Sequence, residues 1–255
     1  MWDAAQYLRF GDERSRPFFD LVGRIGAGQP GYVVDLGCGP GNLTATLAQR
    51  WPQAKVAGFD SSPEMIDAAT RAGYPGVAFS RADVTDWVPD RSPDVIVCNA
   101  VLQWVPGHDD LLVRWADQLN ADGWLAFQLP GNLDSPAHAI VAELAESARW
   151  RGLLDGVRHN KQAGDPAHYV QLLAKDGYEV DAWETTYLHM LRGADPVLEW
   201  TKGTTLRPVL AELDAEQAAE FTAEYARRVR EAYEEGPFGT IFPFRRVFTV
   251  LHRRG

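Results

Sequence analysis

The segment that most constrains the fold is a short apolar run followed at once by three closely spaced glycines. Residues 32–44 read Tyr-Val-Val-Asp-Leu-Gly-Cys-Gly-Pro-Gly-Asn-Leu-Thr. Val33, Val34 and Leu36 are apolar and partly β-branched, which is typical of a strand covered on both faces. The glycines allow positive φ angles and let a ligand approach bare backbone. The segment therefore predicts a buried strand, a ligand-binding turn and a helix whose first amides face the ligand.

Apolar runs and helical patterns alternate from this segment to about residue 129. The predicted strands are Val33–Leu36, Val56–Phe59, Val77–Ser80, Val95–Cys98 and Trp124–Leu129. The predicted helices are Leu43–Arg50, Pro63–Ala72 and Asp109–Leu119. Such alternation is typical of a parallel sheet with right-handed crossovers. Ser62 before Pro63 is a favourable helix start, with a capping hydroxyl followed by proline in the first turn.

The pattern changes in the second half of the chain. We expect helices at about 134–150, 165–176, 195–210 and 214–235, and strands at about 178–188 and 244–252. The whole predicts a single α/β domain over residues 1–255, built on a doubly wound, mostly parallel seven-stranded sheet of Rossmann-like type. Its ligand-binding core would span about 30–130, and a helical lid insertion would span about 190–240. No role is predicted for segment 151–165.

Composition excludes several classes of partner. The 255 residues carry a net charge of −10, which disfavours nucleic acid or an anionic membrane as the main partner. The two cysteines do not suggest a disulfide framework. The N-terminal residues lack the basic and apolar regions of a signal peptide. No apolar run reaches the length of a membrane span, so we expect a cytoplasmic protein.

Polar residues end successive strands, where doubly wound sheets bind their ligands. Asp60 ends the second strand, roughly 20 residues beyond the glycine loop, which is the spacing at which an acid reaches a ribose diol. Asp83 and Asn99 end the third and fourth strands. A nicotinamide dinucleotide is disfavoured because its fingerprint needs Gly or Ala where this chain has Asn42.

The run Asp-Leu-Gly-Cys-Gly-Pro-Gly at 35–41 resembles motif I of the class I S-adenosylmethionine-dependent methyltransferases. Further segments, at 6–10, 13–17, 99–106, 200–208 and 242–245, are similar to the trans-aconitate 2-methyltransferase family. The resemblance implies S-adenosylmethionine as the cofactor and one carboxylate of trans-aconitate, a small polycarboxylate, as the methyl acceptor. It also implies that Asp83 accepts from the adenine amino group.

Motif and strand-end arguments together give one set of candidate cofactor-binding residues. Met65 and Val84 would sandwich the adenine. The carbonyl of Gly37 and the backbone and side chain of Asn99 would meet the methionine ammonium group. Tyr7 would close over the cofactor from the N-terminal segment. The full set is Asp35, Gly37, Gly39, Gly41, Asp60, Ser61, Met65, Asp83, Val84, Asn99, Tyr7 and Arg14.

The implied acceptor needs little acid–base chemistry. A carboxylate is already ionised at pH 7, so attack on the sulfonium methyl needs alignment rather than a strong general base. Trp104 and Gln103, after the fourth strand, are the candidates for positioning the substrate. Arginines bind carboxylates bidentately, and the substrate-binding candidates are Arg9, Arg207, Arg245 and Arg246, with Arg14 as a further choice. The histidines lie too far apart in the sequence to suggest a zinc site, and no metal is expected.

Three other functions stay open at this point. A carboxyl methyltransferase acting on malonyl-carrier protein or on another small carboxylic acid is the nearest alternative. An NAD-dependent oxidoreductase and a catalytically silent S-adenosylmethionine-binding protein belong to other classes. The sequence leaves the choice between monomer and homodimer undecided, and it does not give the regiochemistry of methylation.

Overall fold

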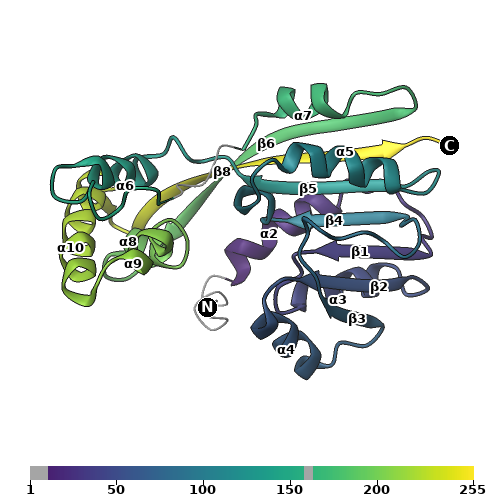
Figure 1. The fold of residues 1–255 in the computed structure, drawn as a ribbon, viewed down its shortest axis with the longest axis horizontal. Helices are drawn as coiled ribbons and strands as arrows, with labels where there is room; N and C mark the ends of the chain where they lie inside the picture. The colour runs from purple at the N-terminus through teal and green to yellow at the C-terminus, as the bar shows by residue number, and fades with distance from the viewer. Residues whose placement is uncertain (1–10, 158–162) are drawn as a thin grey trace. The chain divides into compact units, whose positions relative to one another are not determined.

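The computed structural model describes residues 11–157 and 163–255, with side chains described from Ser15 onward in the first range (Figure 1). The chain divides into two units. Unit 1 comprises residues 1–129, 163–184 and 246–255, and unit 2 comprises 130–162 and 185–245. The expected helical insertion, 190–240, therefore lies within unit 2, to which the segment 130–162 also belongs.

Unit 1 contains the parallel sheet that the alternating sequence pattern predicts. Its parallel strands are β1 (Tyr32–Leu36), β2 (Lys55–Asp60), β3 (Val77–Arg81), β4 (Val95–Asn99) and β5 (Trp124–Pro130). Each lies within one residue of its predicted bounds at either end. The helices of this unit are α2 (Gly11–Val22), α3 (Asn42–Arg50), α4 (Pro63–Ala72), α5 (His108–Gln118) and α7 (Pro166–Leu173).

The strand order of the described sheet is β3-β2-β1-β4-β5-β8-β6. The seven strands on this path confirm the predicted number. β6 (Tyr178–Leu191) and β8 (Gly239–Arg253) are longer than predicted, and a two-residue strand, β7 (Glu235–Gly236), which the sequence analysis missed, pairs antiparallel with β8. The order reverses at β1, whose neighbours are β2 and β4, and such a switch point is where doubly wound sheets bind ligands.

The core of unit 1 shows why its strands form. Every residue of β1 is buried, as a run of β-branched and aliphatic side chains between two layers requires. Trp115 of α5 is fully buried and lies edge-on to Trp87, with ring centroids 6.5 Å apart. Ser62 caps α4 by accepting from the amide of Met65, as predicted. The sheet is therefore a rigid support for the loops at its strand ends.

Unit 2 is mostly helical. It contains α6 (Pro136–Glu146), α8 (Pro196–Lys202), α9 (Arg207–Glu212) and α10 (Ala215–Ala232). The prediction of one helix over 195–210 was wrong: Gly203 ends α8, and a turn separates it from α9. The helix expected to run to about residue 150 ends at Glu146. Phe221 of α10 is fully buried and packs edge-on against Trp150 at 5.3 Å. None of the described helices has both the length and the apolar character needed to cross a bilayer.

Candidate functional site

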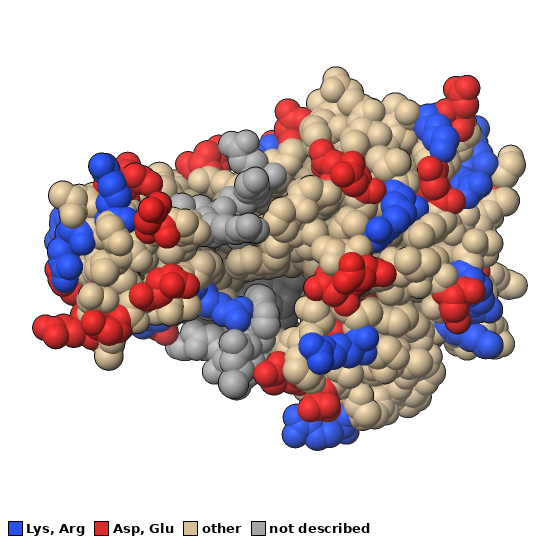
Figure 2. Space-filling model, viewed as in Figure 1, with Lys and Arg blue, Asp and Glu red and all other residues tan. Residues whose placement is uncertain are grey.

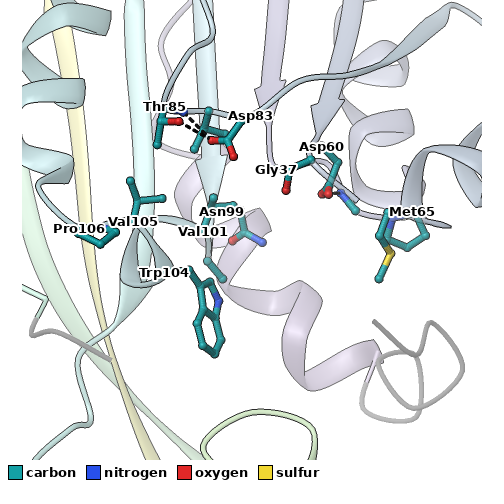
Figure 3. A pocket seen from close by; sticks show the side chains of 15 residues that line it. Gly37, Asp60, Met65, Asp83, Thr85, Asn99, Val101, Trp104, Val105 and Pro106 are labelled. Carbon is teal, nitrogen blue, oxygen red and sulfur yellow. Dashed lines mark hydrogen bonds between the residues drawn. The ribbon is translucent and has the colours of Figure 1, made fainter. Parts of the chain in front are cut away.

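A cavity of about 400 Å³ lies at the carboxyl ends of the parallel strands of unit 1, around the switch point (Figure 3). Its volume is in the usual range for small-molecule and cofactor sites. It is lined by Gly37, Gly39, Pro40, Asp60, Ser61, Met65, Asp83, Val84, Thr85, Asn99, Ala100, Val101, Trp104, Val105 and Pro106. Most of the residues proposed from motif and strand-end arguments are thus brought together in one place.

The glycine loop after β1 forms one wall of this cavity. Gly37 and Gly39 have φ angles of 79° and 55°, in the left-handed region that favours glycine. A Cβ at Gly37 would overlap the side chain of Val101. At Gly39, by contrast, no atom of the described residues beyond its chain neighbours lies within 4 Å of the position of a Cβ. The backbone of Gly39 therefore faces open space that a ligand can occupy.

Gly41 has a different task from the other two glycines. It precedes α3 with a φ of 82°, and a Cβ there would overlap Phe79 and crowd Ala69. It is not among the residues that line the cavity. Its lack of a side chain lets α3 approach the sheet closely, so the structure favours a packing role over the predicted contact with a cofactor.

Asp60 is held at the end of β2 by two backbone amides. Its Oδ2 accepts from the amide of Gly39 at 2.9 Å, and its Oδ1 accepts from the amide of Ser62 at 2.9 Å. A carboxylate oxygen has more than one lone pair, so each oxygen can accept a further hydrogen bond. The carboxylate joins the glycine loop to the start of α4 and still offers two acceptors to the cavity, which suits a vicinal diol.

Asp83 follows β3 and also lines the cavity. Its Oδ1 accepts from both the amide and the hydroxyl of Thr85, at 2.9 and 2.7 Å (Figure 3). These two hydrogen bonds lower the pKa of Asp83 below its usual value. The side chain is therefore an ionised acceptor, which is the chemistry that an adenine amino group requires.

Asp35, the first residue of the motif, does not line the cavity. Its side chain is 2% exposed, and its Oδ2 accepts from the Thr44 hydroxyl at 2.6 Å. Burial raises its pKa to about 7, against the opposing effect of the Thr44 hydrogen bond and with a smaller contribution from the charge of Asp60. The predicted cofactor contact of Asp35 is not a direct one in this geometry. The carboxyl instead ties β1 to α3 behind the glycine loop.

Asn99 ends β4 at the centre of the cavity lining (Figure 3). Its Oδ1 accepts from Nε2 of Gln128 at 2.6 Å, and Oε1 of Gln128 accepts from Nη1 of Arg246 at 3.2 Å. Gln128 is fully buried and Arg246 is 5% exposed. Arg246 was expected to bind substrate, but it lies behind the cavity wall, where Gln128 separates it from Asn99.

Ala100 gives the chain a sharp turn after β4. Its φ of 58° is uncommon for a residue with a side chain. Nε2 of Gln103 donates to the Ala100 carbonyl at 2.7 Å, which holds this turn. Gln103 was predicted to position substrate, but it is not among the lining residues. Trp104, predicted with it, does line the cavity.

Among the described residues, Arg207 and Arg245 are not part of this cavity lining. Arg207 is at the start of α9 in unit 2. Arg245 is also in unit 2, where its Nη1 donates to the carbonyl of Gly131 at 2.9 Å. Tyr7 and Arg9 lie outside the described residues, as does the side chain of Arg14.

Sequence reasoning missed several residues in and behind the cavity wall, and two of them left a signal. Gln128 is a polar residue inside an otherwise apolar predicted strand, and a buried amide needs hydrogen-bond partners. Thr85 follows Asp83 by two residues, a spacing typical of local side-chain turns. Ala100, Val101 and Val105 also line the cavity, but their small apolar side chains gave no chemical signal.

These observations fit a nucleoside cofactor such as S-adenosylmethionine. The bare backbone of Gly39 lets a ligand approach the glycine loop closely. The paired acceptors of Asp60 suit a ribose diol, and the ionised carboxylate of Asp83 suits an adenine amino group. Met65 and Val84 supply apolar surface on the lining. Within the described residues, no group of three or more His, Cys, Asp or Glu side chains is placed to hold a metal ion.

Comparison with known proteins agrees with this chemistry. Residues 10–182 match the family described as Methyltransferase domain. Among solved structures, YcgJ from Bacillus is similar in fold, with a TM-score of 0.59 at 14% identity over 94% of this chain and 99% of that one. A plantazolicin methyltransferase, BpumL, solved in complex with SAH, has a TM-score of 0.53 at 14% identity over 99% of this chain and 86% of its own.

Curated relatives are much closer in sequence. A trans-aconitate 2-methyltransferase of Streptomyces avermitilis is 52% identical over 99% of this chain and 97% of its own length. One of Rhodococcus jostii is 51% identical over 98% of both chains. The chain therefore belongs to the trans-aconitate 2-methyltransferase family, within the class I S-adenosylmethionine-dependent methyltransferases.

Proposed function

We propose that this enzyme esterifies one carboxylate of trans-aconitate, giving a monomethyl ester and S-adenosylhomocysteine. The observation that carries the proposal is the identity of 52% with a trans-aconitate 2-methyltransferase over 99% of the chain. The cofactor supplies a methyl group on a positively charged sulfur, which a carboxylate oxygen attacks directly.

Different residues of the cavity would bind different parts of the cofactor. Asp60 would accept from the ribose hydroxyls and Asp83 from the adenine amino group. Met65 and Val84 would pack on the two faces of the adenine. The carbonyl oxygens of Gly37 and Asn99 would accept from the methionine ammonium group.

The chemistry of the lining suits an acceptor that is already ionised. None of the described residues that line the cavity is His, Lys or Cys, and Asp83 is held as a carboxylate by Thr85. Direct attack by a carboxylate requires no proton removal. The rate enhancement can therefore come from positioning of the acceptor and exclusion of water. We infer that Trp104, on the cavity rim, helps to orient the acceptor.

The spare carboxylates of the acceptor need cations, and arginine is the side chain best suited to them. Arg207 and Arg245 are our candidates, with Arg9 and Arg14 in the N-terminal segment. A carrier-protein acceptor would instead favour a basic surface patch. On the face drawn in Figure 2, basic side chains are interspersed with acidic ones, which favours a small acceptor.

A substrate panel tests the proposal directly. The enzyme is incubated with S-adenosylmethionine and, separately, trans-aconitate, cis-aconitate, citrate, malonate and a malonyl-carrier protein, and S-adenosylhomocysteine is measured. We expect trans-aconitate to have the highest kcat/KM and mass spectrometry to show addition of one methyl group. Turnover of the carrier protein above that of every free acid would refute the assignment, as would cofactor binding without turnover of any acid.

A further inference from the structure

Hydrogen bonds in unit 1 connect Asn99, on the cavity wall, through Gln128 to the buried cation of Arg246. Nη1 of Arg246 lies 3.2 Å from Oε1 of Gln128, and Nε2 of Gln128 lies 2.6 Å from Oδ1 of Asn99. Asn99 and Gln128 face each other in register on β4 and β5. All three residues lie on strands of the sheet, so the fold determines the geometry of this chain of hydrogen bonds.

The direction of these hydrogen bonds follows from chemistry alone. A guanidinium group only donates, so the group that Gln128 turns toward Arg246 must be its oxygen. The NH₂ group of Gln128 then faces Asn99, and Asn99 must meet it with its own oxygen. Arg246 therefore determines the orientation of both side-chain amides. Because the oxygen of Asn99 faces Gln128, its NH₂ group is left to face the cavity.

We propose that Gln128 and Arg246 are positioning residues that lock the Asn99 carboxamide so that its NH₂ group donates to a carboxylate of a bound molecule. The proposal rests on the proposed function only in taking this cavity as the methyl-transfer site. It gives the Asn99 side chain a different role from the expected contact with the methionine ammonium group. An ammonium group has no acceptor, so the methionine ammonium can be met by carbonyl oxygens but not by this NH₂.

The surroundings of Asn99 bear on the proposal that its NH₂ group donates to a bound carboxylate. The ionisable side chains of the described cavity lining, Asp60 and Asp83, are both acidic and would repel an anion, so a bound carboxylate depends on a neutral donor such as the NH₂ group of Asn99. Within the described part of the chain, Nδ2 of Asn99 has no hydrogen-bond partner. The buried charge of Arg246 polarises the two amides in the direction that strengthens donation from Asn99. An anion at this point of the cavity is thereby favoured.

Two carboxylates fit this chemistry: that of the cofactor's methionine moiety and that of the methyl acceptor. The key variant is Gln128→Glu. Its carboxylate accepts from Arg246 and from the NH₂ of Asn99, so the Asn99 amide turns over and presents its oxygen to the cavity. Because a hydrogen bond to a charged group is replaced by repulsion, we expect carboxylate binding to weaken about ten- to hundred-fold.

Calorimetry on the full chain separates the two sources. Kd is measured for S-adenosylmethionine, for decarboxylated S-adenosylmethionine and, with S-adenosylhomocysteine bound, for trans-aconitate. If the cofactor carboxylate is read, Gln128→Glu weakens S-adenosylmethionine and spares the decarboxylated analogue. If the acceptor carboxylate is read, only trans-aconitate weakens. Neither measurement needs turnover, so the result stands apart from the outcome of the substrate panel.

Controls distinguish positioning from loss of structure. Gln49→Glu, at an exposed position of α3, adds the same charge and should leave each Kd within about two-fold. Arg246→Lys keeps a donor toward Gln128 and should retain more affinity than Arg246→Met. In an Asn99→Ala background, Gln128→Glu should have no further effect. Kd values within two-fold of wild type for Gln128→Glu, or an equal loss with and without Asn99, would overturn the proposal.

Discussion

The buried carboxyl of Asp35 makes a sharp prediction about stability and pH. Its pKa is raised from 3.8 to about 7, mainly by burial. The native state therefore keeps a proton that the unfolded chain loses between about pH 4 and pH 7. Since stability falls with pH wherever the native state binds more protons, Asp35 weakens the apo protein progressively across this window. Above about pH 7 both states are ionised and the penalty is complete.

Asp35→Asn removes this titration and keeps a side-chain oxygen for the Thr44 hydroxyl. From pH 5 to the pKa of about 7, the penalty grows by about 1.4 kcal/mol per pH unit, which is roughly 3 kcal/mol. Urea unfolding of wild type and variant at pH 5 and pH 8 measures it. The stability of Asp35→Asn relative to wild type should be greater at pH 8 by that amount, because all other titrating groups cancel in the comparison.

Two further variants guard this interpretation. Thr44→Val removes the hydroxyl that stabilises the ionised form, so it should destabilise the protein more at pH 8 than at pH 5. Asp67→Asn, at an exposed position of α4, removes the same charge. Its free energy of unfolding relative to wild type should change by less than about 0.5 kcal/mol between the two pH values. A change for Asp35→Asn no larger than that of Asp67→Asn would refute the reasoning.

Four other outcomes are expected. Gly37→Ala combines a positive φ with overlap on Val101, so its Tm should fall and its affinity for S-adenosylmethionine should drop together; an unchanged Tm would contradict the packing argument. Asp60→Ala should weaken cofactor binding by about 2–4 kcal/mol, and calorimetry showing wild-type affinity would exclude the ribose contact. Arg207→Ala should raise KM for the acceptor with little change in kcat, whereas an unaltered KM would place the anion site elsewhere. The kcat at saturating substrates should be flat from about pH 6 to 8, and a bell-shaped profile would reveal a general base.

The strands and the cavity of unit 1 were predictable because their signals are local. A buried parallel strand reads as an apolar run, and the residue at its end is known once the run is known. The positions of Asp60, Asp83 and Asn99 in one cavity follow from that rule. The three glycines were equally visible, but the division between ligand space at Gly39 and packing at Gly41 depends on side chains far along the chain.

What could not be predicted depends on long-range pairing. Arg246 was predicted to bind substrate, and only its place on β8 shows that it is buried beside Gln128. The break between α8 and α9 is different, because Gly203, which ends α8, was a local helix-stop signal that the sequence analysis did not use. The membership of residues 130–162 in unit 2 comes from the packing of α6 with α10, which periodicity does not reveal.

The strand order has a consequence for how the chain is made. β8 is inserted between β5 and β6, so during synthesis β6 is complete well before its neighbour in the sheet exists. A long unpaired strand is a template for association with other nascent chains. Glu179, Asp181 and Glu184 place exposed acids along the first half of β6. Repulsion between such charges disfavours pairing of an unpaired strand with its copies, so we expect these acids to limit association of nascent chains.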